Sequence, residues 1–258
     1  MSWAMRALMA CLLLIVAAGP ALADPSGVDG ARAAYAEGRF AEAAAIAGEG
    51  SAADAHELAA AAELARLMTN EPGLDRPAAA HRARVHAEAA LAIDDALADA
   101  HLRLAAALGF QGRFTSPLMA YLRGLPQRGR DHIATAIRLD PDDPWGHAML
   151  GAWHLEVVRR GGEGTLGASL DEGLARYEAA VRMAADEPGI PYHFALALIA
   201  ADPDAYGERA EALLERAIAA EPEDAFAEAM IDQARSLLSL LRDDPVAAQA
   251  HAIDRLER

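Results

Sequence analysis

The sequence contains no lysine, because all 23 of its basic residues are arginine. Chemistry that depends on a lysine side chain is therefore excluded, including a Schiff base, the phosphate-binding lysine of a P-loop and a Ser–Lys pair. Cysteine is almost absent too, since Cys11 is the only one. A disulfide within the chain is therefore impossible. The single thiol lies in a segment that we expect to be removed.

Long apolar runs are confined to the N-terminus. Arg6 precedes an apolar run over residues 7–18, and Ala21-Leu22-Ala23 matches an A-x-A cleavage site. These features predict a signal peptide cleaved after Ala23, and hence a periplasmic or secreted protein. The alternatives are an uncleaved anchor and a lipoprotein box at Cys11, which fits poorly because the apolar run mostly follows the cysteine. No later run approaches the roughly 20 apolar residues of a membrane span, so we expect no membrane insertion after cleavage.

Aromatic residues are also scarce, with five Phe, five Tyr and three Trp in 258 residues. About a quarter of the chain is alanine, the residue with the highest helix propensity. The expected fold class is all-α, because the residue types that favour strands are the scarce ones. We expect a single domain over residues 24–258, which is long enough to bury a sizeable core.

Basic residues are outnumbered by acidic ones. The formal net charge at pH 7 is −16, and it becomes −17 when the signal peptide and its Arg6 are removed. This acidity argues against nucleic acid and anionic membrane as main partners, because both are polyanions that attract basic proteins.

A helix–turn–helix join over residues 131–154 organises the sequence. Ala134, Ile137 and Leu139 end an amphipathic helix, two prolines set a turn at residues 140–144, and a second helix follows. The pattern A-I-x-L-D-P followed by x-L-G resembles the join between two tetratricopeptide repeats. Residues 33–44 resemble the same repeat, with an aromatic residue, a G-x-F corner and small residues where the second helix packs. The resemblance implies a right-handed superhelical stack of antiparallel helix pairs, an α-solenoid.

The residues that set the turns between repeats recur at Asp95, Pro141, Pro188 and Pro222, at intervals of 46, 47 and 34 residues. The last interval is the tetratricopeptide period. The two longer intervals indicate insertions, which we place at residues 114–130 and 161–169, and insertions of this kind often carry function. The frame predicts roughly five helix pairs, a capping helix over 224–241, and a short final helix or frayed tail over 246–258.

A narrower resemblance concerns the order of features from Arg84 to Leu241. It is similar to the layout of the regulator of microtubule dynamics family, which includes bacterial members with tetratricopeptide-like repeats. The similarity covers about 160 residues and depends on spacing and on residues such as Gly151 and Trp153. It implies a fold rather than a function, because an exported protein does not meet microtubules.

No motif of the sequence predicts catalysis, a cofactor or a metal site. His56, His101 and His147 share one repeat position, but neighbouring repeats hold them too far apart for coordination at ~2 Å, so we interpret them as packing residues. Residues 162–167 match G-x-G-x-x-G, yet they follow a helix instead of a strand, which indicates a flexible loop. The serines and threonines lie in neither G-x-S-x-G nor S-x-x-K.

Arginines gather between His101 and Leu139, where six of them face a single acidic residue, Asp131. One interpretation is that they form ion pairs across the stack. The other is a patch for a carboxylate, a phosphate or an acidic peptide, since guanidinium forks suit such groups. The candidate residues of this anion patch are Arg113, Arg123, Arg128 and Arg130.

The residues predicted to bind in the groove are Trp145, Tyr192, Arg103 and Phe110. Trp145 and Tyr192 begin first helices of repeats, where the tetratricopeptide family exposes side chains to its concave surface; hydrophobic stapling of the helix start is the alternative. We therefore predict a non-catalytic binding or scaffold protein of the cell envelope, with another protein or an extended peptide as partner. The alternatives are a hydrolase-type enzyme and a holdase-like factor that use the same groove.

Overall fold

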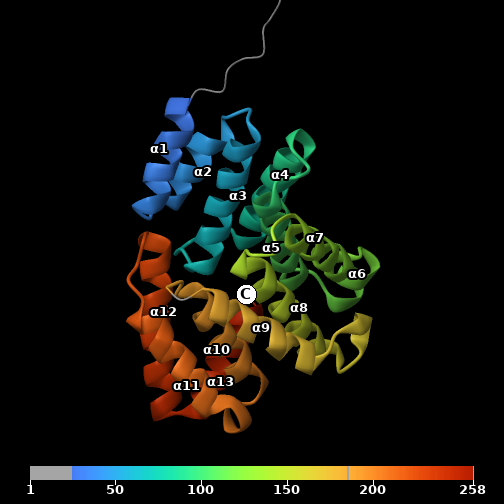
Figure 1. The fold of residues 1–258 in the computed structure, drawn as a ribbon, viewed down its shortest axis with the longest axis vertical. Helices are drawn as coiled ribbons and strands as arrows, with labels where there is room; N and C mark the ends of the chain where they lie inside the picture. The colour runs from blue at the N-terminus through green and yellow to red at the C-terminus, as the bar shows by residue number, and fades with distance from the viewer. Residues whose placement is uncertain (1–24, 185, 258) are drawn as a thin grey trace, which may run out of the picture.

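The computed structural model describes residues 25–184 and 186–257, and the expected signal peptide at residues 1–23 lies outside them. The described part is all-helical, as its alanine content predicts (Figure 1). No helix in these ranges is both long enough and apolar enough to cross a membrane. The elements are α1 (Pro25–Ala36), α2 (Phe40–Gly48), α3 (Ala53–Met68), α4 (Arg76–Ile93), α5 (Ala98–Arg113), α6 (Pro117–Leu122), α7 (Leu125–Leu139), α8 (Pro144–Gly161), the 3-10 helix η1 (Thr165–Gly167), α9 (Leu170–Met183), α10 (Gly189–Ala201), α11 (Pro203–Ala219), α12 (Ala225–Asp243) and α13 (Pro245–Glu257).

Proline and a capping side chain fix the start of α8, in the join that organises the sequence. The carboxylate of Asp143 accepts a hydrogen bond from the backbone N–H of Trp145 at 2.9 Å, and Pro144 takes the first helical position. The carboxylate pairs an N–H that has no partner within the helix, and proline has no N–H to leave unpaired there. Helices α4, α6 and α11 begin in the same way. These boundaries are therefore encoded locally.

Within the described ranges, helices pack against their neighbours in the sequence, and these contacts can be grouped as six consecutive pairs where roughly five were expected. The pairs are α1 with α2, α3 with α4, α5 with α7, α8 with α9, α10 with α11, and α12 with α13. Glycine permits the closest approach, because a Cβ added to Gly151 on α8 would lie 2.8 Å from the ring of Tyr177 and 2.9 Å from the carbonyl oxygen of Gly173 on α9. Gly151 is therefore needed for this helix contact.

The row of helices curves until its two ends meet (Figure 1). Helix α12 contacts α1. The amide nitrogen of Gln233 on α12 and the guanidinium of Arg255 on α13 both donate hydrogen bonds to the carbonyl oxygen of Met68 at the end of α3, at 3.3 and 2.7 Å. The inner side of the row is therefore partly enclosed. Of the two alternatives for the C-terminal segment, the helix is right, and α13 has Ala248 and Ala252 fully buried.

The two expected insertions lie next to each other. The first contains α6 and the start of α7, and the second contains η1. They are joined by a hydrogen bond of 3.2 Å from Nη1 of Arg130 to the carbonyl oxygen of Leu166. The glycine-rich loop of the second insertion follows helix α8, and Gly162, Gly164 and Gly167 all have positive φ angles. This geometry fits a tight loop and lacks the preceding strand that a phosphate-binding motif needs.

Candidate functional site

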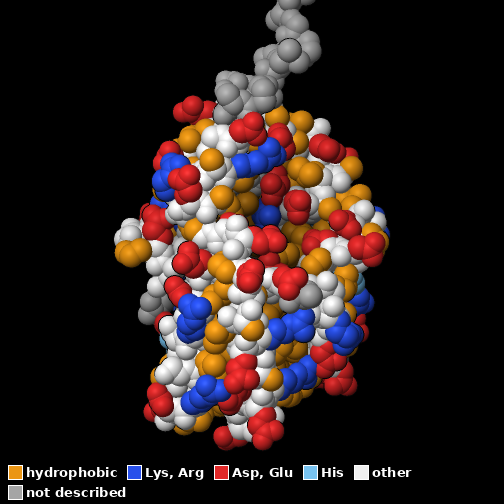
Figure 2. Space-filling model, turned by 60° about the vertical axis from the view of Figure 1, so that its left-hand side comes forward, with side chains coloured by type: hydrophobic (Ala, Val, Ile, Leu, Met, Phe, Trp, Pro, Cys, Tyr) orange, Lys and Arg blue, Asp and Glu red, His pale blue; other side chains and the backbone are white. Residues whose placement is uncertain are grey.

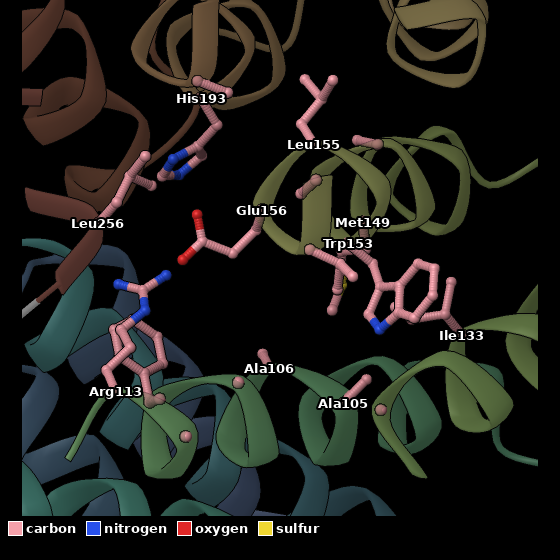
Figure 3. A pocket seen from close by; sticks show the side chains of 18 of the residues that line it. Ala105, Ala106, Arg113, Ile133, Met149, Trp153, Leu155, Glu156, His193 and Leu256 are labelled. Carbon is pink, nitrogen blue, oxygen red and sulfur yellow. The ribbon is translucent and has the colours of Figure 1, made fainter. Parts of the chain in front are cut away.

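The inner side of the molecule encloses a cavity of about 960 Å³, here called the central cavity. Helices α3, α5, α8 and α10 contribute most of its wall, and residues of α7, α9, α11, the last turn of α13 and both segments expected as insertions add to it. Most of the residues on the wall are apolar, including Ile133, Met149, Leu155 and Leu256 (Figure 3). The cavity is thus a mainly hydrophobic chamber between helices that are far apart in the sequence.

Three polar side chains meet at one end of the central cavity, here called the polar end. Arg113 comes from the last turn of α5, Glu156 from α8 and His193 from α10. Figure 3 shows these three side chains pointing toward one another across the cavity. Because each comes from a different helix pair, the polar end exists only in the folded protein.

Arg113 carries a charge that forms no ion pair within the described ranges of the chain. Its guanidinium carbon lies 4.3 Å from the centroid of the Phe110 ring, and Nη1 donates a hydrogen bond to the carbonyl oxygen of Arg255 at 3.4 Å. Burial lowers the pKa of Arg113 to about 10, against the opposing effect of the Glu156 carboxylate. Arg113 therefore remains charged at pH 7 in surroundings that compensate its charge only partly.

Glu156 is engaged by the arginines of its own helix. It accepts hydrogen bonds from Nε and Nη2 of Arg159 at 2.9 and 3.0 Å, and it also pairs with Arg160. Burial raises the pKa of the Glu156 carboxyl, but the two arginines outweigh this effect and the net pKa lies below the ordinary value. Arg159 also reaches Glu257 at 3.6 Å. Glu156 is thus a carboxylate at neutral pH and its charge is balanced locally.

His193 has a buried nitrogen, Nε2, that lacks a hydrogen-bond partner in the part of the chain that the structure describes. Burial lowers the pKa of His193 to about 3, so the imidazole is neutral at pH 7. Its ring meets the Trp145 ring edge-on at a centroid distance of 6.2 Å. An unpaired buried nitrogen costs free energy, and it offers a hydrogen bond to a molecule in the cavity.

The last turn of α13 closes the polar end. Nη2 of Arg255 donates hydrogen bonds to the carbonyl oxygen of Met68 at 2.7 Å and to Oε1 of Gln233 at 2.5 Å. Leu256 adds an apolar side chain to the wall. The sequence did not predict this role of the C-terminal helix, because the contacts join residues that are as many as 187 positions apart.

Three of the four predicted groove residues, Trp145, Arg103 and Phe110, line the central cavity. Tyr192 does not, because its side chain is only 1% exposed and its hydroxyl donates a hydrogen bond to Oε1 of Gln233. The placement of Tyr192 on the groove is therefore wrong. The next residue, His193, faces the cavity instead, since each residue of a helix is rotated by about 100° from the one before it.

The four arginines of the predicted anion patch are dispersed. Arg113 is the one of the four that lines the central cavity. Arg128 and Arg130 each pair with an acidic side chain, at 3.6 and 3.3 Å, and Arg123 is exposed at the end of α6. Figure 2 shows the same interleaving of acidic and basic side chains over one face of the molecule. Ion pairing thus accounts for Arg128 and Arg130, and the anion interpretation is left to Arg113.

Two of the three histidines that were predicted to share a repeat position, His101 and His147, contact the turns that precede their helices. Nε2 of His101 and Nε2 of His147 lie 3.0 and 3.1 Å from the carbonyl oxygen six residues earlier. A carbonyl can only accept, so Nε2 carries the hydrogen and Nδ1 is left to accept. Nδ1 of His101 meets Nδ1 of His132 at 2.9 Å, and Nδ1 of His147 meets the Arg176 guanidinium at 3.4 Å. Over residues 25–184 and 186–257, no group of three or more His, Cys, Asp or Glu side chains could hold a metal ion.

Glu156, His193 and Arg255 belong to the site, although the sequence did not predict them there. The repeat frame could have pointed to His193. This residue follows the turn residue Pro188 by five positions and lies next to Tyr192, which was predicted to face the groove. Comparison of the chain with protein-family models and with curated proteins finds no match.

Proposed function

We propose that the protein is an exported, non-catalytic binding protein that holds its ligand in the central cavity. The observation that supports this most directly is the cavity itself, whose volume of about 960 Å³ falls in the range of ~300–1,000 Å³ typical of ligand sites. Its wall is mainly apolar and its polar groups are few and gathered at one end. In such sites the apolar area supplies affinity, and the few polar groups fix orientation.

The proposed framework is a right-handed, tetratricopeptide-like stack of helix pairs. The contacts between consecutive helices, the recurrence of the turn residues, and the contact of His101 and His147 with the turns support it. In this frame α3, α5, α8 and α10 are the first helices of successive repeats, and these helices contribute most of the cavity wall. Such a stack presents its first helices on its inner side.

The expected partner was another protein or an extended peptide, and the enclosure of the cavity narrows this expectation to a smaller ligand. The hydrogen bonds of Gln233 and Arg255 to Met68 join the two ends of the row of helices. A long strand that runs along an open groove fits this arrangement poorly, whereas a compact molecule or a short segment fits it well. We therefore propose a ligand that is enclosed, at least in part, by the inner helices.

The chemistry of the polar end favours binding over the alternative of an enzyme. Among the described residues, His193 is the one histidine on the cavity wall, and its pKa of about 3 is far from the operating pH that a general acid or base needs. The carboxylate of Glu156 is occupied by two arginines. A binding role uses Arg113 and His193 as they stand, without a proton transfer.

Filling the central cavity tests the proposal. Gly109 on α5 lines the cavity, and a Cβ added there meets no atom within 4 Å, so Gly109→Trp places an indole in the cavity without a clash at the backbone. Gly207 on α11 has the same open surroundings outside the cavity, and Gly207→Trp is the matched control. Each purified protein is incubated with an extract of the cell envelope, and captured molecules are detected by native mass spectrometry.

We expect the wild type and Gly207→Trp to gain the same additional mass and Gly109→Trp to gain none. Far-UV circular dichroism and the unfolding midpoint establish that both variants are folded. Equal capture by Gly109→Trp, or no captured mass on the wild type, contradicts the proposed function.

A further inference from the structure

The polar end of the central cavity has an excess of positive charge. Arg113, Arg159, Arg160 and Arg255 line this part of the cavity, whereas Glu156 is the one carboxylate that the described residues place among them on the wall. Glu156 is already balanced by Arg159 and Arg160, whereas Arg113 has no carboxylate partner in the described part of the chain. A buried charge without a counter-ion is costly, and an incoming anion relieves this cost.

Two side chains at the polar end, Arg113 and His193, can donate hydrogen bonds to a ligand. The guanidinium of Arg113 offers N–H groups in a planar fork, which matches the two oxygens of a carboxylate. In the tautomer that carries its hydrogen on Nε2, neutral His193 supplies one further N–H, and this nitrogen lacks a partner among the described residues. A group with a single negative charge and two acceptor oxygens satisfies both side chains.

The remainder of the cavity sets the character of the rest of the ligand. Between the polar end and Trp153, at the opposite side of the view in Figure 3, the wall consists of side chains such as Met149, Leu155 and Ile133. A peptide brings one N–H and one C=O per residue, and these groups lose free energy where an apolar wall leaves them unpaired. An aliphatic chain has no such groups, and burying it contributes roughly 0.8 kcal/mol per CH₂.

We infer that the ligand of the central cavity is a small amphipathic monocarboxylate, with its carboxylate between Arg113 and His193 and its aliphatic body along the apolar wall. This inference rests on the proposed function and specifies its ligand. Leu256 and the main chain of Arg255 then form the closed end against which the carboxylate lies. The ligand is enclosed and is not a strand that passes through.

Binding of defined probes by isothermal titration calorimetry tests the inference. The probes share one chain length and differ in the head group: dodecanoate, dodecan-1-ol, dodecyltrimethylammonium and dodecyl phosphate, each below its micelle concentration. We expect dodecanoate to bind at least about tenfold more tightly than dodecan-1-ol, since hydrogen bonds to charged groups are the strong ones. The cationic probe should bind most weakly of the four.

Single substitutions show which residues cause the difference in affinity between dodecanoate and dodecan-1-ol. Arg113→Gln should weaken dodecanoate about tenfold or more and leave dodecan-1-ol unchanged, because only the charged contact is lost. His193→Phe keeps an aromatic ring without a nitrogen and should weaken dodecanoate by a smaller factor, about threefold. Arg138→Gln is the matched control, because Arg138 is an exposed arginine on α7 whose side chain donates to Thr135 outside the cavity. Gly109→Trp should abolish binding of all four probes.

The outcomes separate this inference from the proposed function. Equal affinities for dodecanoate and dodecan-1-ol, tighter binding of dodecyl phosphate than of dodecanoate, or an Arg113→Gln variant that binds dodecanoate like the wild type overturn the monocarboxylate. If no probe binds but the wild type still captures a molecule or a peptide from the envelope extract and Gly109→Trp does not, the ligand class is wrong and the proposed function stands. If Gly109→Trp binds as the wild type does, the cavity is not the site and both proposals fail.

Discussion

The N-terminal and C-terminal halves of the molecule build their interiors in different ways. From α8 onward, one large hydrophobic cluster contains fully buried large side chains such as Phe194, Leu214 and Met230. From α1 to α7, the interior is divided into several small clusters in which alanine predominates. Alanine lets helices approach closely but buries little area per residue. The N-terminal half therefore depends more on close helix contacts and on polar pairs, and the central cavity lies where the two kinds of interior meet.

Truncation of a leucine should give the largest difference in lost stability between the two halves. Leu214→Ala removes a fully buried side chain from the large cluster and should cost about 4 kcal/mol, because a closed cavity remains. Leu64→Ala should cost only about 2 kcal/mol, because Leu64 borders the central cavity and its truncation enlarges a space that already exists. Equilibrium unfolding in urea measures both values. Equal losses for the two variants would mean that the halves are packed alike.

A buried ion cluster is the feature of the N-terminal half with the next largest expected effect. Glu63 on α3 is 4% exposed and accepts hydrogen bonds from Arg82 on α4 at 2.6 Å and from Arg66 at 3.2 Å. Glu63→Gln keeps the shape but leaves both arginines without their shared carboxylate, which should cost about 2 kcal/mol, less than a fully buried pair because the Arg82 side chain is 42% exposed.

The matched change in the C-terminal half is Glu178→Gln, which breaks the pair with Arg209. The Glu178 side chain is 45% exposed, so water replaces much of the lost interaction and the expected cost is below about 1 kcal/mol. Urea unfolding of both variants gives the comparison. If Glu178→Gln costs as much as Glu63→Gln, the N-terminal half has no special dependence on polar contacts.

The two halves also show which features can be predicted from sequence. The all-α class and the join at residues 140–144 depend on local signals, namely alanine content and proline positions, and the structure has both of them. The polar end depends on contacts between α5, α8, α10 and α13, which no local pattern encodes. The error at Tyr192 has the same origin, because a frame misplaced by one residue turns a helical side chain from the core to the cavity.

Paired histidines make the N-terminal half sensitive to acid. His86 meets His56 at 3.3 Å between ring nitrogens, and His132 meets His101 at 2.9 Å. Burial, and then the charge of the partner histidine, lower the pKa values of His86 and His132. A folded-state pKa below the unfolded value of about 6.5 means that stability is fully present above that pH and is lost as the pH falls through the folded-state pKa.

We therefore expect the urea midpoint of the wild type to be lower at pH 5 than at pH 7.5. The double variant His86→Gln/His132→Gln should show a smaller difference between the two pH values, because glutamine does not titrate. For each protein, the urea midpoint at pH 5 is compared with its own midpoint at pH 7.5. Carboxylates that titrate over this range then contribute equally to the pH difference of the wild type and of the double variant. An unchanged difference in the double variant would assign the acid sensitivity to other groups.

The smallest expected effects come from two glycines, and they test whether the halves unfold together. Gly109 on α5 and Gly207 on α11 each have no atom within 4 Å of an added Cβ. Alanine at either position should stabilise its helix by about 0.5–1 kcal/mol, because glycine loses more backbone entropy on folding. In one cooperative transition, both substitutions raise the same thermal midpoint by similar amounts. If Gly207→Ala instead raises only a later step while Gly109→Ala raises an earlier one, the alanine-rich half unfolds first and the central cavity opens before the C-terminal core is lost.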